Sequence, residues 1–229
     1  MSQSQFQRTE RLLGECAMKR LAAAHVMVFG LGGVGGAAAE ALARAGVGRL
    51  TLVDADVVEF TNLNRQLIAL HSTLGLPKAE VAAARCRDIN PACTVLPRHA
   101  RYTAETREDF FGELCDYIID AIDSVTDKLD LIVTAKARGV PILSAMGTGN
   151  KLDPTQLRVA DIGKTEGCPL ARVMRRELRR RDIHHLKVVF SPERPRGDGE
   201  RTPASSPWVP VSAGLLMAAE AVRDLTGAW

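Results

Sequence analysis

The sequence predicts an α/β protein built on a doubly wound, mostly parallel sheet with helices on both faces. Two observations support this prediction. Short apolar runs alternate with longer stretches in which apolar residues recur at helical spacing. The first of these runs, residues 25–29, leads directly into glycines at G-x-G-x-x-G spacing, Gly30, Gly32 and Gly35, which is typical of a Rossmann-like strand, turn and helix. At 229 residues the chain can bury one substantial core, so we expect a single domain over residues 1–229.

Apolar periodicity and helix-stopping residues define the elements of the first half of the chain. After the buried strand and the glycine turn comes a second strand that ends in an acid, Asp54. Asn90 and Pro91 stop a later helix. In order, we expect a polar arm and a helix over 1–22, a strand over 25–29, a helix over 37–45, a strand ending at 54, a helix over 78–89, a peripheral strand over 93–97 and a helix over 106–114.

The second half begins with a short isoleucine-rich run that should be a central strand. The final third is less regular, and its proline-rich, polar segment predicts a flexible loop within a C-terminal extension. In order, we expect a strand over 117–122, a helix over 127–138, a strand over 140–145, the flexible segment MGTGN, a strand over 156–161, a basic helix and a strand ending near 190, the loop over 191–210 and a helix over 212–225.

Composition excludes few functions. Hydrophobic residues make up 46% of the chain and charged residues 25%, and the net charge of +3 does not demand a nucleic-acid partner. The five cysteines are scattered and form no C-x-x-C pair, which argues against a disulfide framework and a four-cysteine zinc site. With no membrane-spanning run and no secretory signal at the start, we expect a cytoplasmic protein.

The glycine turn has the features of a nucleotide site. Glycines let backbone N–H groups approach a phosphate at the positive end of a helix, and the residues concerned are Gly30, Gly32, Gly33 and Gly35. Asp54, at the end of the second strand, can accept hydrogen bonds from ribose hydroxyls. The glycines alone are also compatible with a close contact between helix and strand, so they do not identify the ligand.

The segment after Asp54 separates this site from a general dinucleotide site. Arg65 can grip phosphate oxygens with its planar guanidinium, and Lys78 offers a mobile point charge. Asp123 and Ser124 follow the next central strand, so they should lie at the same sheet edge as the glycine turn. There Asp123 can hold a Mg²⁺ ion that bridges phosphates.

These motifs resemble the ThiF and MoeB type of adenylating enzymes, which are related to ubiquitin-activating enzymes. The matching segments are GLGGVGG at 30–36, LVDADVVEFTNLNRQ at 52–66, GLPK at 75–78, INP at 89–91 and DAIDS at 120–124. The resemblance implies that ATP occupies the site rather than NAD. It also implies a homodimer in which Arg11 enters the ATP site of the partner subunit. The other implied roles are ribose binding by Asp54, phosphate binding by Asn62, Arg65 and Lys78, and magnesium binding by Asp123.

Within this family the sequence is similar to the tRNA threonylcarbamoyladenosine dehydratases. The similar segments are RLLGE at 11–15, DAIDSVTDK at 120–128, LDPTQLRVADIGKT at 152–165 and VVFSPE at 188–193. This resemblance implies an ATP-dependent ligase and cyclase of tRNA modification, which forms an acyl-adenylate on a threonylcarbamoyl carboxylate and then closes a ring. That scheme requires no catalytic thiol, although Cys168 lies in a plausible catalytic neighbourhood.

A basic segment in the last third is compatible with a tRNA partner. Its cations can contact phosphates, or they can form an ordinary solvated helix face, and the sequence leaves both readings open. His184 and His185 beside it are more typical of a surface than of a catalytic site. The candidate nucleic-acid residues are Arg172, Arg175, Arg176, Arg179, Arg180, Arg181 and Lys187.

Three alternatives remain open at this stage. The first is an adenylyltransferase that activates the C-terminal glycine of a ubiquitin-like sulfur-carrier protein, which would make a carrier or sulfur donor a partner. The second is a non-catalytic nucleotide-binding protein, and the third is an NAD-dependent oxidoreductase. The missing C-x-x-C pairs argue against the first, and the cations after Asp54 argue against the third.

Overall fold

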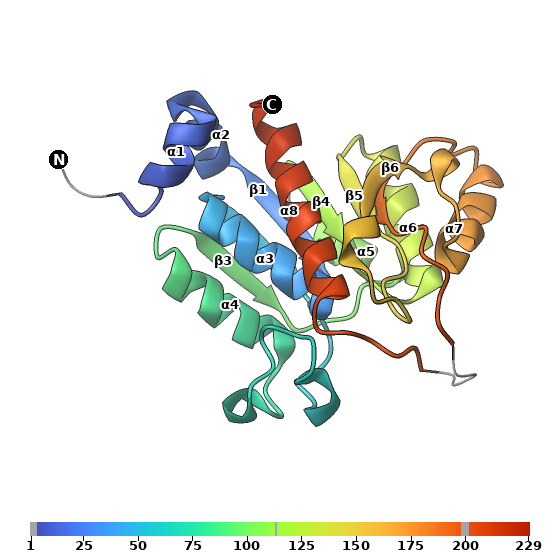
Figure 1. Ribbon diagram of the computed structural model, residues 1–229. Helices are drawn as coiled ribbons and strands as arrows, with labels where there is room; N and C mark the ends of the chain where they lie inside the picture. The colour runs from blue at the N-terminus through green and yellow to red at the C-terminus, as the bar shows by residue number, and fades with distance from the viewer. Residues whose placement is uncertain (1–3, 113, 198–201) are drawn as a thin grey trace.

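A seven-stranded sheet forms the centre of the computed structural model, which describes residues 4–112, 114–197 and 202–229 (Figure 1). The strand order is β3-β2-β1-β4-β5-β7-β6, and only β6, paired with β7, runs antiparallel within this sheet. The predicted doubly wound, mostly parallel sheet is therefore confirmed. The strands are β1 His25–Phe29, β2 Arg49–Val53, β3 Thr94–Arg98, β4 Tyr117–Asp120, β5 Ile142–Ala145, β6 Arg158–Asp161 and β7 Lys187–Phe190.

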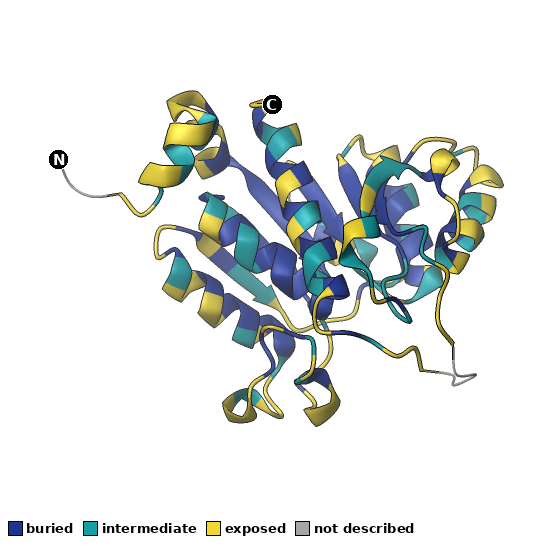
Figure 2. Ribbon diagram, in the orientation of Figure 1, coloured by how far each residue is buried: buried dark blue, intermediate teal, exposed yellow. Residues whose placement is uncertain are grey.

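Helices cover both faces of the sheet. Alternate residues of β1 belong to two different clusters of buried side chains, Val26 and Val28 to one and Met27 and Phe29 to the other, as expected for a strand buried on both sides. The first cluster includes residues of α2 Glu15–Ala23, α3 Gly33–Ala45, α4 Lys78–Ile89 and α8 Val209–Thr226. The second includes residues of α5 Arg107–Phe111, α6 Val125–Ala137 and α7 Pro169–Arg179. Figure 2 shows the sheet as the buried centre.

Several predicted boundaries shift. The single N-terminal helix is two, α1 Gln7–Leu13 and α2, because Gly14 between them has φ of +85°. Helix α3 begins at Gly33 instead of Ala37, so the glycines themselves form its first turn. Helix α5 ends at Phe111, and position 113 of the longer predicted helix lies outside the described residues. Helix α8 begins at Val209, with proline in its first turn, where a missing N–H costs nothing.

The predicted loop over 191–210 contains no helix or strand before Val209 in its described parts, and residues 198–201 lie outside them. Both described ends are bonded to the MGTGN segment. The Asn150 carbonyl accepts from the Arg196 N–H at 2.7 Å, and the Asn150 side chain and N–H pair with the backbone of Ala204, each at 2.7 Å. Trp208 donates its indole N–H to the Leu152 carbonyl. The expected mobility of this loop therefore stays a prediction, while its anchoring points are defined.

The edges of the sheet are formed by β3 and β6. Strand β3 carries Pro97, which aligns with Leu52 of β2. The N–H of Thr94 points inward, donating to the Gly48 carbonyl at 2.9 Å, and the alternation of a parallel strand then turns position 97 outward. No helix among the described residues is long and apolar enough to cross a membrane.

Candidate active site

A cavity of about 960 Å³ opens at the carboxyl ends of β1 and β4. Strand order reverses direction between these two strands, which is where open α/β sheets bind ligands. One side, which we call the glycine-loop wall, consists of residues 29, 30, 32–34, 53–56, 59, 62, 65, 66, 78, 100–102, 121–124 and 127. The remaining lining residues, which we call the α7 wall, are 145–151, 168–170, 195, 202, 203, 205 and 210.

The glycine turn is closely packed against the next strand and its own helix. A Cβ at Gly30, where φ is +84°, would lie 2.6 Å from the Ala121 carbonyl oxygen. A Cβ at Gly35 would lie 1.8 Å from the Gly30 oxygen, so Gly35 seats the helix on the turn and does not line the cavity. Gly32 and Gly33 at the start of α3 do line it. The first turn of α3 therefore presents its positive end to the cavity.

Asp54 links the glycine turn to the second strand. Its carboxylate accepts the Leu31 N–H at 2.6 Å and the Asp56 N–H at 2.8 Å. Burial raises the pKa of Asp54, and the two backbone N–H bonds act in the opposite direction. Because each carboxylate oxygen can accept a further hydrogen bond, Asp54 can shape the turn and still receive ribose hydroxyls.

The predicted phosphate-binding residues meet on the same wall. The Lys78 side chain is buried, and its Nζ lies 2.8 Å from an oxygen of the exposed Asp56 carboxylate. Arg65 lines the cavity and donates from Nη1 to the Thr61 carbonyl at 3.0 Å. Asn62 is buried, and its Oδ1 accepts the Glu59 N–H. Two cations and an amide therefore face the end of α3, as polyphosphate binding requires.

Asp123 and Ser124 also reach this wall, directly after β4. Ser124 is the N-cap of α6 and accepts the Asp127 N–H at 3.4 Å, a structural duty that the sequence analysis did not assign. Asp127 in turn accepts from Arg101 at 2.7 Å. No group of three or more His, Cys, Asp and Glu side chains among the described residues could hold a metal alone. A Mg²⁺ ion at Asp123 would need oxygens of the nucleotide as its other ligands.

The fold also brings to the site polar residues that the sequence motifs do not predict. Gln66 is buried in the glycine-loop wall, and its Oε1 has no hydrogen-bond partner among the described residues. Beneath the cavity, the fully buried Lys128 ammonium lies 2.8 Å from the Asp120 carboxylate and 3.3 Å from the Ser144 hydroxyl. Lys151, in the α7 wall, is also buried. Gln66 belongs to the NLNRQ motif, but no local pattern reveals the other partners, because they lie on different strands and helices.

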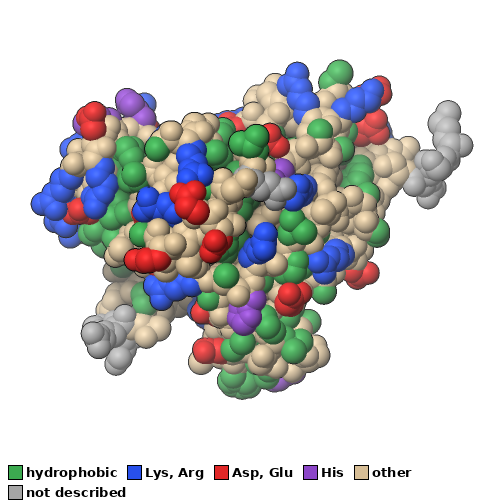
Figure 3. Space-filling view, turned by 180° about the vertical axis from the view of Figure 1, so that it is seen from behind, with side chains coloured by type: hydrophobic (Ala, Val, Ile, Leu, Met, Phe, Trp, Pro, Cys, Tyr) green, Lys and Arg blue, Asp and Glu red, His purple; other side chains and the backbone are tan. Residues whose placement is uncertain are grey.

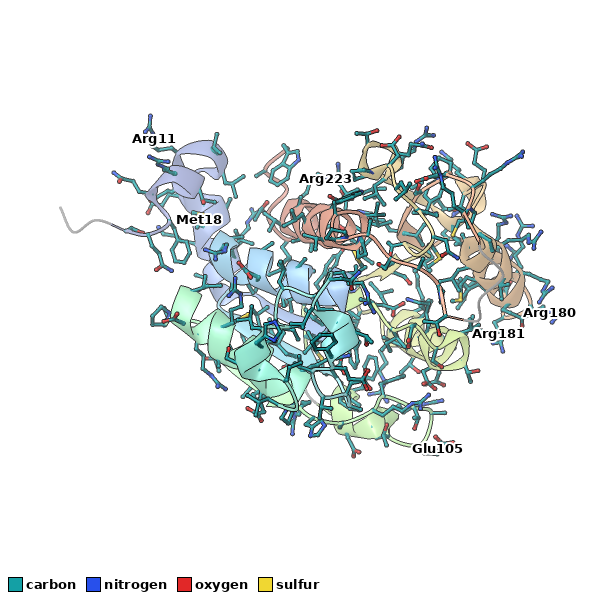
Figure 4. All side chains as sticks on the ribbon, turned by 60° about the horizontal axis from the view of Figure 1, so that its bottom comes forward. Arg11, Met18, Glu105, Arg180, Arg181 and Arg223 are labelled. Atoms are coloured by element: carbon teal, nitrogen blue, oxygen red, sulfur yellow. The ribbon has the colours of Figure 1, made fainter. Side chains whose placement is uncertain are left out.

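Arg11 does not reach the cavity of its own chain. It is exposed on α1, a helix with no buried residue. Figure 4 shows its side chain pointing outward at the opposite end of the molecule from Arg180 and Arg181. This position is compatible with the predicted role in a partner subunit and excludes a role in the same chain's site.

The basic segment contains five exposed arginines, three of which pair with Glu177 at 3.0–3.3 Å, and two less exposed cations that are bonded to other elements. Lys and Arg side chains gather at the left edge of the face in Figure 3, where α7 lies, and the exposed arginines are Arg172, Arg176, Arg179, Arg180 and Arg181. Arg175 instead donates to the carbonyl and the hydroxyl of Thr165, at 2.8 and 2.7 Å. Lys187 bridges Glu220 and Asp224, each at 2.7 Å. These last two cations are less available to an external partner than the sequence suggested.

Cys168 is the N-cap residue of α7 and is buried in the α7 wall. Its Sγ would lie 3.5 Å from a Cβ built on Gly147. A thiol is therefore present at the cavity, in the α7 wall.

Comparison with known proteins relates this site to a family. The model of the ThiF family matches residues 5–228. The tRNA threonylcarbamoyladenosine dehydratase of Bacillus subtilis (strain 168) is 44% identical, over 96% of this chain and 94% of that protein. The crystal structure of E. coli tRNA N6-threonylcarbamoyladenosine dehydratase, TcdA, in complex with ATP superposes with a TM-score of 0.92 and 38% identity, covering 97% and 94% of the two chains. The SAMP-activating enzyme E1 of Haloferax volcanii is 39% identical, over 54% of this chain and 46% of that protein.

Proposed function

The chain belongs to the ThiF family, and from this premise we propose that it is an ATP-dependent tRNA threonylcarbamoyladenosine dehydratase. The observation that carries the proposal is a single cavity in which Arg65, Lys78, Asp54 and the α3 N-terminus surround a space for ATP, with a second polar wall left for the group to be activated. Similarity to dehydratases extends through both walls, because it covers nearly the whole chain.

The first step is adenylation. An oxygen of the threonylcarbamoyl carboxylate attacks the α-phosphorus of ATP, the bond from that phosphorus to the bridging oxygen of the β-phosphate breaks, and pyrophosphate leaves. Negative charge develops at phosphorus and on the departing group, so the step needs positive charge held in place beforehand. Arg65, Lys78 and the N–H groups of the α3 start supply it, with Asp54 holding the ribose. Asn62 and Gln66 add polar contacts from the same wall.

The second step closes a ring. A nucleophile of the same modified base attacks the activated carbonyl, the bond from the carbonyl carbon to the AMP oxygen breaks, and one proton is released. The two steps together remove the elements of water from the base and convert ATP into AMP and pyrophosphate. No enzyme thiol is needed, which leaves Cys168 outside the reaction in this scheme.

Mg²⁺ fits the donor set of the site. Asp123 offers one carboxylate at the sheet edge, and the ion's remaining ligands would be phosphate oxygens and water. Bound there, the ion would offset phosphate charge. Arg101, bonded to Asp127 beside this position, adds a cation that the sequence analysis did not include.

The tRNA would lie along the exposed arginines of α7, since this helix also lines the cavity with its first residues, Pro169 and Leu170. That arrangement lets one helix contact the RNA backbone while its N-terminus faces the modified base. The five exposed arginines supply sequence-independent phosphate contacts.

We also propose the homodimer that the family resemblance implies, with Arg11 entering the partner's site. Helix α1 buries none of its residues within the chain, and Leu12 beside Arg11 is 86% exposed. A helix with this exposure is suited to a partner surface. The expected cytoplasmic location also stays a prediction, supported by five free cysteines, which are typical of reducing compartments.

The runner-up function is activation of a sulfur-carrier protein. Its support is the part of the fold that this chain shares with carrier-activating enzymes. The similar carrier-activating protein matches only about half of this chain, whereas the dehydratases match both walls. We therefore expect neither a carrier nor a sulfur donor as the partner in the reaction.

The decisive experiment incubates the purified protein with ATP, Mg²⁺ and tRNA bearing threonylcarbamoyladenosine. We expect AMP, pyrophosphate and a nucleoside lighter by one water, measured by mass spectrometry of the digested tRNA. Pyrophosphate release with a sulfur-carrier protein and none with this tRNA would favour the runner-up. ATP binding without turnover would favour a non-catalytic protein, and binding of NAD in place of ATP would favour an oxidoreductase.

A further inference from the structure

Lys151 is an unusual feature of the α7 wall. It is 2% exposed, yet it lines the cavity, and its Nζ donates one hydrogen bond, to the Ser191 carbonyl at 2.7 Å. Within the part of the chain that the structure describes, no carboxylate lies within 4.0 Å of this ammonium. The group therefore keeps N–H donors for a further partner at the cavity.

A buried ammonium without a counter-ion is costly, because burial removes water and nothing of opposite charge replaces it. Burial lowers the pKa of Lys151, and the neighbouring Cys168 and Glu193 act in the opposite direction. Glu193 does not act as a close counter-ion, since its carboxylate accepts the backbone N–H groups of Leu152 and Asp153 at 3.0–3.1 Å. The Lys151 ammonium therefore has no carboxylate in direct contact with it among the described residues.

The N-terminus of α7 provides a second source of positive potential at the same place. The 11-residue helix begins at Pro169, and its N-cap, Cys168, makes no side-chain capping bond. Both residues line the cavity with Lys151. Pro169 has no N–H, but the free N–H groups of the residues that follow it in the first turn favour an anion, and Lys151, which lines the same cavity, adds positive charge.

The anion that fits this position is a carboxylate of the acceptor, because the glycine-loop wall already supplies cations for the phosphates of ATP. Arg65, Lys78 and the start of α3 line the glycine-loop wall, where the polyphosphate would bind. We propose that Lys151, together with the N-terminus of α7, binds the threonylcarbamoyl carboxylate and directs it toward the α-phosphate. The inference rests on the proposed function and names the residue that recognises its substrate. Lys151 is in this view a binding and positioning residue for an acidic acceptor.

The test compares two ligands and two substitutions. The ligands are an anticodon stem-loop RNA carrying threonylcarbamoyladenosine and the same RNA with the carboxylate converted to its methyl ester. The proteins are wild type, Lys151→Met, Lys151→Arg and the exposed control Lys136→Met. Binding is measured in the presence of a non-hydrolysable ATP analogue, and ATP affinity is measured separately.

We expect wild type and Lys136→Met to bind the acid about 10-fold or more tightly than the ester, as for a hydrogen bond to a charged group. Lys151→Met should lose this preference while its ATP affinity stays unchanged, and Lys151→Arg should recover part of it. A Lys151→Met protein that folds and keeps the full preference for the acid would overturn the inference. If Lys151 had only a structural role, Lys151→Met would weaken the binding of both RNAs equally or lower the unfolding midpoint. The ratio of the affinities for the acid and the ester would then stay unchanged.

The wild-type protein separates this inference from the proposed function. If wild type does not cyclise the modified tRNA with ATP, the proposed function itself fails. If wild type cyclises it and Lys151→Met still discriminates acid from ester, only the role of Lys151 fails. Covalent capture of the acceptor at Cys168, detected by intact-protein mass spectrometry and lost in Cys168→Ser, would also overturn the role of Lys151 as the acceptor site.

Discussion

The two walls of the cavity are constructed in different ways. The glycine-loop wall comes mostly from one continuous stretch, and its polar side chains are held by nearby backbone, as Asp54 is by Leu31 and Arg65 by Thr61. The α7 wall is assembled from the β5 end, the α7 start and the segment before α8, which meet only in the folded chain. Most residues of the glycine-loop wall therefore lie in one stretch of the sequence, whereas the α7 wall forms only through tertiary structure.

A buried polar cluster lies where the two walls join. Lys128 binds Asp120 at the end of β4 and Ser144 in β5, and these strands lead into the glycine-loop wall and the α7 wall respectively. The side chains of Lys128 and Asp120 are fully buried. The cluster thus couples the positions of both walls, so a change within it should affect both of them.

The largest expected effect comes from breaking this cluster. Lys128→Met leaves the Asp120 carboxylate buried without its partner, so we expect a loss of about 3–5 kcal/mol in the free energy of unfolding. Denaturant unfolding measures it. The double variant Asp120→Asn with Lys128→Met should recover much of the loss, because no charge remains buried. A single-variant loss below about 1 kcal/mol would mean that the pair adds no more than a surface ion pair does.

The next effect should be confined to the glycine-loop wall. Arg65→Ala removes a cation from the developing charge, and we expect pyrophosphate release to fall about 100-fold or more. The free energy of unfolding should change little, because the Arg65 contacts are exposed. Lys136→Ala, an exposed change on α6, is the control. Turnover at the wild-type rate in the Arg65 variant would remove this residue from the site.

A third change, at the exposed arginines of α7, should affect only the binding of tRNA. Replacing Arg172, Arg176, Arg179 and Arg180 by alanine should weaken tRNA binding about 10-fold or more and reduce its salt dependence, since fewer counterions are released. ATP affinity should not change. Arg175→Ala on the same helix is the matched control, because its guanidinium is bonded to Thr165 inside the protein. Equal losses in all these variants would indicate damage to α7 instead of lost phosphate contacts.

The smallest expected effect is in an experiment on the dimer. It tests whether Arg11 of one subunit completes the ATP site of the other. Mixing inactive Arg11→Ala with inactive Arg65→Ala should restore activity to about a quarter of wild type, because half of the random dimers are mixed and each has one intact site. Turnover after unfolding and refolding the two variants together measures it. Continued inactivity of the mixture, with mixed dimers present, would place Arg11 outside the partner's site.

The difference between local and tertiary contacts also explains which features the sequence predicts. The doubly wound, mostly parallel sheet and the glycine turn with the residues after Asp54 follow from local patterns, since Gly30, Asp54 and Arg65 lie in readable motifs. The break at Gly14 was missed because one glycine within a helical pattern is often tolerated. The inward turn of Arg175 and the pairing of Lys128 with Asp120 depend on helix rotation and strand neighbours, which one-dimensional spacing does not contain.

Pro97 has a consequence for the behaviour of many copies of the protein together. An edge strand normally presents a row of outward N–H groups to which a strand of another molecule can add, and such additions start aggregation. At the outward position of β3 the proline ring has no N–H to offer. The sheet therefore resists extension from this side. Pro97→Val should leave the fold unchanged and raise light scattering in concentrated, warmed solutions.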